Sequence, residues 1–283
     1  MDLFSKEYQE HVRNMRKRFF QTGSLEGITG VRQEILACWE AAYLKEITPN
    51  DAKKKVASPE EYAAALEQSA DLLEVAEPYM RRLYSFLDPE SFWVALMDRN
   101  GVILKLVGSP TMLKVARATD LVEGSYRGGE QPYPGLYYVC WQLDQPVQIV
   151  SGEHPSLIDD GLAGAAAPIH AWESGEFLGV IGVSGYYEKS HGHTLPLTIM
   201  AAEAIAQKMA LQSLASGGEG YTVPSQRAGV TGLSREAEAL LDLLRRHQGN
   251  ISEVARELGV SRPTIYRNMK KYGINLAGKW MHY

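Results

Sequence analysis

The sequence predicts an α+β protein: an antiparallel sheet with flanking helices, preceded by a helical segment and followed by a small all-α domain. Helical patterns fill the first third of the chain, and strand patterns with turn signals begin near residue 91. A Gly-, Ser- and Pro-rich stretch then precedes a basic helical end, as is typical of a linker between domains. We therefore divide the chain into residues 1–90, 91–214, 215–230 and 231–283.

The composition is that of a globular protein. The 283 residues are 45% hydrophobic and 22% charged, and a chain of this length forms about two domains. The amino end is charged where a signal peptide needs an apolar run, and no stretch approaches about 18 apolar residues. Two cysteines, Cys38 and Cys140, fit a reducing compartment, and no Cys/His metal spacing occurs. We expect a cytoplasmic protein that does not enter a membrane and has no metal or cofactor.

The first 90 residues are predicted to be helical. Pro49 and the pair Ser58-Pro59 mark helix boundaries, because proline lacks the N–H that a helix interior requires. The predicted helices lie near 3–20, 30–46 and 59–87.

Residues 91–214 carry the sheet. The segments FWVALMD and VILKLVG flank Arg99-Asn100-Gly101, and Asn-Gly at such a tip is a strong hairpin signal. The further predicted strands are PVQIV (146–150), AGAAAPI (163–169) and FLGVIGVS (177–184), and helices are predicted near 134–144 and 195–214. The last helix has apolar residues on more than one face, which predicts two packing partners, one of them a second subunit.

The carboxyl end is basic although the whole chain is acidic. Residues 230–283 contain nine Lys/Arg and five Asp/Glu, a net charge of +4, whereas the complete chain has a net charge of −5 and the remainder therefore −9. A short basic domain on an acidic body is typical of a nucleic-acid anchor, because phosphate neutralisation requires local positive charge.

This basic domain is predicted to contain three helices. Gly249-Asn250 ends the first, and Gly259-Val260-Ser261 makes a short turn before the third, which accepts Pro263 in its first turn. The inward-facing apolar residues are Ala237, Leu240, Leu241 and Leu244 in the first helix, Val254, Ala255 and Leu258 in the second, and Ile265, Met269 and Tyr272 in the third.

The third helix presents cations opposite its apolar stripe, which suits the major groove of duplex DNA. Arg262 and Arg267 can each form a forked contact with guanine, whereas Lys270 and Lys271 at the far end are suited to phosphate. The predicted DNA-binding residues are Ser261, Arg262, Thr264, Tyr266, Arg267, Lys270 and Lys271. The alternative is a plain three-helix bundle with a solvated basic face.

The stretch GNISEVARELGVSRPTIYRNMKKYGIN resembles, nearly end to end, the Fis-type helix-turn-helix of bacterial enhancer-binding regulators. This resemblance implies that the protein binds an inverted repeat of double-stranded DNA as a homodimer. It also implies that Ser261, Arg262, Thr264 and Arg267 face the bases.

A second resemblance covers about residues 30 to 214. The segments VRQEILACWEAAY, FWVALMDRNGVILKLVG, QPVQIVSGEH and AAPIHAWESGEFLGVIGVSG are similar, in order and spacing, to the GAF-type sensory domain of the acetoin-catabolism activator-like regulators. The resemblance implies a GAF-like fold that senses a small molecule. The chain departs from that family at Gly135-Leu136-Tyr137, where relatives carry Gly-Thr-Asn, and at Cys140 and Trp141, where relatives carry small residues.

Those regulators place an ATPase between the sensor and the helix-turn-helix. This sequence contains no GxxxxGK[ST] phosphate loop, and the linker is too short to hold an ATPase. We therefore expect no ATP-driven activation of a sigma-54 polymerase. The protein is expected to repress by occlusion, or to activate by recruiting RNA polymerase.

Large aromatic residues gather just before and within the helix predicted near 134–144. Clustered Tyr and Trp rings can enclose a cation or stack on a planar ligand, although ordinary core packing explains them equally well. Glu153-His154 matches the family's Gly-Glu-His turn and could add polar contacts. The predicted ligand-binding residues are Trp93, Tyr126, Tyr133, Tyr137, Tyr138, Trp141, Glu153 and His154. Together with the acidic body, these rings favour a small methylated or protonated amine as the effector, with a planar aromatic compound as the second choice.

Three functional hypotheses follow. The first is a ligand-responsive DNA-binding transcription regulator that is not an enzyme. The second is a redox sensor or an enzyme built on the GAF-like domain and using Cys140. The third is a ligand-independent architectural DNA-binding protein or a corepressor.

Overall fold

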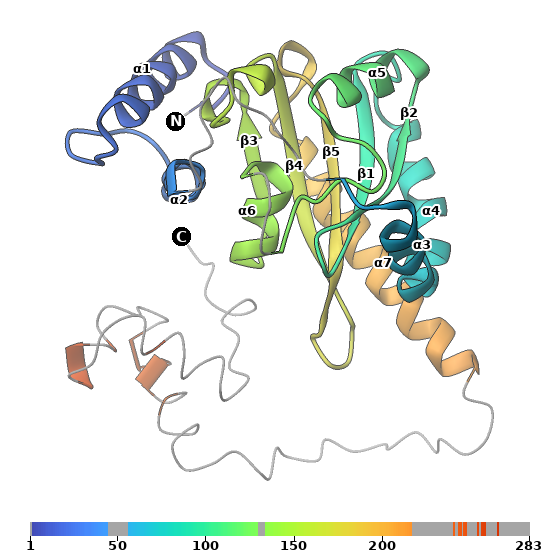
Figure 1. Ribbon diagram of the computed structural model, residues 1–283. Helices are drawn as coiled ribbons and strands as arrows, with labels where there is room; N and C mark the ends of the chain where they lie inside the picture. Colours follow the sequence, from blue (N-terminus) through green and yellow to red (C-terminus); the bar gives the residue numbers. More distant parts are fainter. Residues whose placement is uncertain are drawn as a thin grey trace. The chain divides into compact units, whose positions relative to one another are not determined.

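The computed structural model describes residues 2–44, 56–129 and 134–216, together with individual positions between 240 and 265. The chain divides into two compact units, Met1–Glu219 and Gly220–Tyr283. The first unit contains a five-stranded antiparallel sheet with helices on both faces (Figure 1). The predicted α+β class is therefore confirmed.

The sheet has the strand order β2-β1-β5-β4-β3, and all neighbouring strands are antiparallel. The first two strands form the predicted hairpin, and β1 and β5 pair in the middle of the sheet. Every strand expected from the sequence coincides with an observed one. The strands are β1 (Phe92–Asp98), β2 (Ile103–Gly108), β3 (Val147–Val150), β4 (Leu162–His170) and β5 (Phe177–Tyr186).

The central strand β1 shows why both faces of the sheet are covered. All seven of its residues are buried. Trp93, Ala95 and Met97 belong to one hydrophobic core, and Val94 and Leu96 belong to a second. Since successive side chains of a strand point to opposite faces, the two cores lie on opposite sides of the sheet.

One face is covered by α3 (Pro59–Gln68), α4 (Ala70–Ser85) and α7 (Thr194–Ser216) (Figure 1). The prediction of a single helix over 59–87 was wrong, because Ser69 separates two helices. Ser69 has φ −110° and ψ 17°, and its N–H closes α3 by donating to the Ala65 carbonyl. The break allows α3 to pack beside β2 while α4 packs against β1 and α7.

The other face is covered by α1 (Lys6–Thr22), α2 (Gln33–Leu44), α5 (Pro110–Ala118) and α6 (Leu136–Leu143). Helix α5 was not expected. The Ser109 hydroxyl accepts a hydrogen bond from the Met112 N–H, and Pro110 occupies the first turn. The same Ser-Pro signal marked the start of the predicted helix at residue 59. The sequence therefore contained a signal for the start of α5 as well.

The tip of the β1–β2 hairpin requires glycine. Gly101 has φ +88°, and a Cβ atom there would lie 2.3 Å from the carbonyl carbon of Gly128. The Arg127 N–H also donates to the Gly101 carbonyl at 2.6 Å. The predicted Asn-Gly turn therefore also fixes the segment that carries Arg127.

The described part of the second unit is consistent with packed helices. The N–H of His247 bonds to the Leu243 carbonyl, and that of Leu258 to the Val254 carbonyl, both at 3.0 Å as in an α-helix. The buried residues there are Leu240, Leu243, Leu244, Val254 and Ile265. Leu258, expected to face inward, is 43% exposed.

Within the described residues, no helix has both the length and the apolar character that crossing a membrane requires.

Candidate functional site

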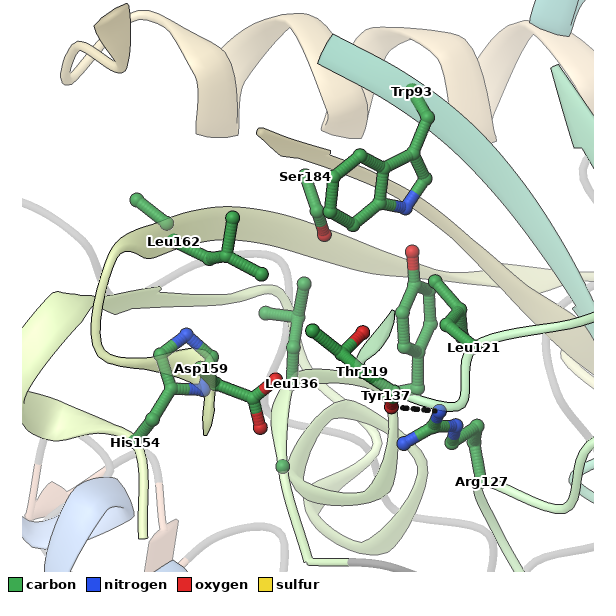
Figure 2. Close-up of a pocket in the computed structure, with 12 residues that line it drawn as sticks. Trp93, Thr119, Leu121, Arg127, Leu136, Tyr137, His154, Asp159, Leu162 and Ser184 are labelled. Carbon is green, nitrogen blue, oxygen red and sulfur yellow. Dashed lines mark hydrogen bonds between the residues drawn. The ribbon is translucent and has the colours of Figure 1, made fainter. Parts of the chain in front are cut away.

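A cavity lies between the sheet and the amino-terminal end of α6 (Figure 2). Strands β1, β4 and β5, helix α6, the α5–α6 connection and the β3–β4 connection all contribute to its wall. A water-sized sphere can move through about 50 Å³ of it, which is room for a few water-sized groups. The lining residues are Trp93, Thr119, Leu121, Arg127, Gly135, Leu136, Tyr137, His154, Asp159, Leu162, Ala163 and Ser184.

The cavity wall contains polar atoms that the protein does not satisfy. Among the described residues, neither buried ring nitrogen of His154 has a hydrogen-bond partner. The buried Trp93 indole N–H and Tyr137 hydroxyl form no hydrogen bond of good geometry, although Tyr137 interacts with Ser184 and Trp93. A buried polar group without a partner costs about 1–3 kcal/mol. Such groups are rare in folded proteins and require an explanation, of which a bound molecule is one.

Burial controls the protonation of two of these groups. Desolvation raises the pKa of Tyr137 to about 12, against a smaller opposite effect of the Ser184 hydroxyl. Desolvation also lowers the pKa of His154 below its ordinary value, against the nearby carboxylates of Asp159 and Glu153. Both side chains are therefore neutral at pH 7, when each can donate and accept hydrogen bonds.

The wall also holds one cation and one anion. Arg127 is buried and donates to the Thr119 carbonyl at 3.1 Å. Asp159 is buried beside His154, and in Figure 2 these two residues lie across the cavity from Arg127 and Tyr137. A ligand would meet opposite charges at opposite ends of this space.

The structure brings three of the predicted ligand-binding residues together at this cavity: Trp93, Tyr137 and His154. Figure 2 shows the Tyr137 hydroxyl pointing toward Trp93 and Ser184. Tyr133 lies outside the described residues.

The other predicted aromatic residues are not among those that line the cavity. Tyr126 packs against the hydrophobic core on the opposite face of the sheet. Tyr138 is buried and stacks on Trp141, with ring centroids 6.5 Å apart, and the Trp141 indole donates to the Arg99 carbonyl at 2.9 Å. Helical geometry separates these neighbours, because Tyr137 and Tyr138 are about 100° apart around α6. The described rings of this segment therefore do not form a cage around the cavity.

Glu153 is fully buried but is occupied by protein groups. Its carboxylate pairs with Arg32 at 2.7 Å and accepts hydrogen bonds from the Tyr8 hydroxyl at 2.6 Å and the Val150 N–H at 2.8 Å. Burial and this carboxylate together raise the pKa of Tyr8. Glu153 therefore fixes the chain next to His154 instead of pointing into the cavity.

Sequence reasoning missed four polar residues of the cavity wall: Thr119, Arg127, Asp159 and Ser184. Ser184 carried a signal, because it is a polar residue on the predicted strand FLGVIGVS. Arg127, Thr119 and Asp159 lie in connections without periodicity, and tertiary folding alone brings them to the cavity.

In the part of the chain that the structure describes, the cysteines and the charged clusters offer neither a reactive thiol nor a metal site. Burial raises the pKa of both Cys38 and Cys140, which leaves their thiols protonated and unreactive. Among the described residues, no group of three His, Cys, Asp or Glu side chains could hold a metal ion. The redox hypothesis at Cys140 therefore gains no support from its surroundings.

The seven residues predicted to contact DNA lie outside the described residues. In the third predicted helix of that domain, the described Ile265 is fully buried, as its apolar stripe requires. Arg246 pairs with Glu257 at 3.5 Å, and His247 also contacts Glu257, which joins the first two predicted helices.

Comparison with known proteins matches residues 234–272 to the family "Bacterial regulatory protein, Fis family". The acetoin dehydrogenase operon transcriptional activator AcoR of Bacillus subtilis is 28% identical over 198 residues, which cover 70% of this chain and 32% of that protein. A signal-transduction and transcriptional-control protein of Clostridium beijerinckii is 24% identical over 151 residues, covering 53% of this chain and 24% of that protein. The matched region thus spans about a third or less of these relatives.

Among solved structures, the crystal structure of the E. coli DhaR(N)–DhaL complex is similar in fold. Its TM-score is 0.61 at 19% sequence identity, covering 65% of this chain and 63% of that chain. The first unit therefore shares the fold of that chain, and residues 234–272 match the Fis family of bacterial regulatory proteins. More particularly, the chain is similar in part of its length to the transcriptional activator AcoR, and its 283 residues contain no GxxxxGK[ST] phosphate loop.

Proposed function

We propose that this protein is a ligand-responsive DNA-binding transcription regulator. Residues 91–214 would bind a small molecule, and the helix-turn-helix in residues 231–283 would bind an inverted-repeat operator. The observation that carries the proposal is the cavity, whose wall holds buried polar atoms of Trp93, Tyr137 and His154, with neither ring nitrogen of His154 hydrogen-bonded among the described residues. The Fis-family match supports the DNA-binding half.

The polar groups of the wall favour a small oxygen-containing ligand. The Trp93 indole can only donate, whereas the Tyr137 hydroxyl and a neutral His154 can donate and accept. Leu121, Leu136 and Leu162 add apolar surface, so the ligand would combine hydroxyl or carbonyl groups with a short hydrocarbon part. A ligand of this kind is also compatible with the similarity to a relative that is named after an acetoin dehydrogenase operon.

The amine expected from the sequence is a poorer fit to this cavity. That expectation depended on several rings enclosing the ligand, and only Trp93 and Tyr137 reach the wall among the described residues. Arg127 and Asp159 carry opposite charges on the wall, so the cavity gives a cation no net electrostatic preference.

A homodimer is part of the proposal, and α7 supplies the support. Met200 is 64% exposed and Leu211 is 62% exposed, although the opposite side of this helix packs on β4 and α4. A helix with apolar residues all round is normally buried on more than one side. A second copy of α7 would cover these side chains and could bring two helix-turn-helix domains to the two halves of an operator.

Without the phosphate loop, regulation would proceed by occluding a promoter or by recruiting RNA polymerase. The test has two stages on the full-length protein. A thermal-shift screen with matched alcohols, ketones, acids, amines and aromatic compounds identifies a ligand, since binding to the folded state raises its stability. Fluorescence anisotropy with a selected operator then measures DNA affinity with and without it. A compound that stabilises the protein and changes DNA affinity supports the proposal, and failure of all compounds to change either favours an architectural DNA-binding protein.

A further inference from the structure

The cavity wall between β3 and β4 is held from outside by the amino-terminal helix. The Arg16 guanidinium donates to the main-chain carbonyl of His154 at 2.8 Å and pairs with Asp160 at 3.0 Å. Arg13 pairs with the other oxygen of the same carboxylate at 3.0 Å and donates to the Ser151 hydroxyl at 2.8 Å. Helix α1 therefore binds this connection near both of its ends, at Ser151 and at Asp160.

Side chains of α1 and α2 also form hydrogen bonds with the residues between Ser151 and Asp160. The Gln9 side-chain oxygen accepts from the Gly152 N–H at 2.8 Å, and the Tyr8 hydroxyl donates to Glu153 at 2.6 Å. From α2, the Trp39 indole donates to the Glu153 carbonyl at 2.8 Å. Consecutive residues of the connection are therefore fixed by side chains that do not themselves line the cavity.

His154 is where this network meets the cavity. Its carbonyl is bound by Arg16, while its ring faces the cavity without a partner among the described residues (Figure 2). The Arg16 side chain is only 5% exposed, so its contacts are shielded from solvent and well defined. Hydrogen bonds to charged groups are about twice as strong as neutral ones, which makes this pair effective in holding the main chain.

We infer that Arg16 and Asp160 are positioning residues of the effector site, whose ion pair fixes the main chain that aims His154 into the cavity. Helix α1 is then part of the sensor although none of its residues lines the cavity. This inference rests on the proposed function, because it assigns a role in the same site.

Replacement of Asp160 distinguishes its role in positioning the main chain at His154 from the direct effect of its charge on the His154 ring. The charged groups that face His154 are Asp159, Glu153, Arg16 and Asp160. Loss of the Asp160 carboxylate by itself would lower the pKa of His154, since a nearby anion favours the imidazolium form. Release of the connection would instead admit water to the ring and raise that pKa toward its ordinary value of 6.5. Loss of charge alone and release of the connection therefore predict changes of opposite sign in the pKa of His154.

The experiment is an NMR titration of the histidine ring signals in the ligand-free full-length protein, with His154 assigned through a His154→Gln variant. We expect Asp160→Ala to raise the titration midpoint of His154, and Glu173→Ala, an equal charge loss on the exposed β4–β5 turn, to leave it unchanged. A midpoint that falls or stays constant in Asp160→Ala overturns the inference.

If Asp160→Ala does not fold, Asp160→Asn is examined by amide hydrogen exchange. Faster exchange confined to residues 151–160 supports positioning, and unchanged exchange there overturns it. Neither measurement uses an effector. A His154 midpoint that moves as expected in a protein that no compound stabilises would therefore uphold the positioning role and refute the proposed function.

Discussion

Gly182 on β5 is the position where a single added methyl group should disturb the cavity. A Cβ atom there would lie 2.5 Å from Cε1 of Tyr137 and 2.9 Å from its hydroxyl oxygen. Because Tyr137 is buried on α6, its ring cannot swing into solvent. Gly182→Ala must therefore push this ring toward the cavity or force α6 away from the sheet.

Overpacking of this kind costs about 1–3 kcal/mol. For a unit of about 200 residues, each kcal/mol lowers the melting temperature by about 2–4 °C, so a decrease of about 2–12 °C is expected. Gly161→Ala is the matched control, because no atom lies within 4 Å of a Cβ at that site. Its stability should change by no more than about 0.5 kcal/mol.

A double-mutant cycle with Tyr137→Leu identifies the cause. If the clash with the ring is responsible, Gly182→Ala should cost less in the Tyr137→Leu background, with a coupling energy of about 0.5–3 kcal/mol. The assay is thermal and urea unfolding of the full-length protein, followed by tryptophan fluorescence. Equal melting temperatures for Gly182→Ala and Gly161→Ala, or strict additivity in the cycle, would refute the packing of Tyr137 against β5.

Three further predictions concern the site and the DNA-binding domain. Since burial holds the pKa of His154 below 6.5, the unfolded chain binds more protons as the pH falls below that value, and stability should decrease from pH 7 to pH 5. This decrease should be smaller in His154→Phe, and an identical pH dependence in urea unfolding would contradict the burial of a neutral ring. Trp141→Ala removes the stacking on Tyr138 and the hydrogen bond to Arg99. It should lower stability but preserve the thermal shift caused by a ligand, and loss of that shift would place Trp141 in the effector site. Arg267→Ala should cost about 1–3 kcal/mol of affinity for a specific operator and little for random DNA, as judged by anisotropy. An equal loss on both would make Arg267 a phosphate contact.

The sequence by itself determined the local elements. The apolar run FWVALMD and the Asn-Gly tip predicted the first hairpin, and the apolar segments before and after Ser174-Gly175 predicted two further strands. These signals depend on short apolar runs and on the backbone conformations that turn residues adopt, so they can be read without knowing the fold. The helix break at Ser69 escaped this reasoning, because the apolar pattern continues through it and only packing against the sheet requires a change of direction.

The tertiary structure decided which residues form the site. Tyr137, Tyr138 and Trp141 look alike in the sequence, but Tyr138 lies about 100° around α6 from Tyr137 and Trp141 lies one helical turn further along, and only Tyr137 reaches the cavity among these three. Arg127 and Asp159 come from connections whose paths no periodic pattern predicts. Arg16 and Asp160 are 144 residues apart and meet only because α1 packs beside the end of β3. Local sequence fixes which face a residue can occupy, whereas long-range packing fixes what lies opposite that face.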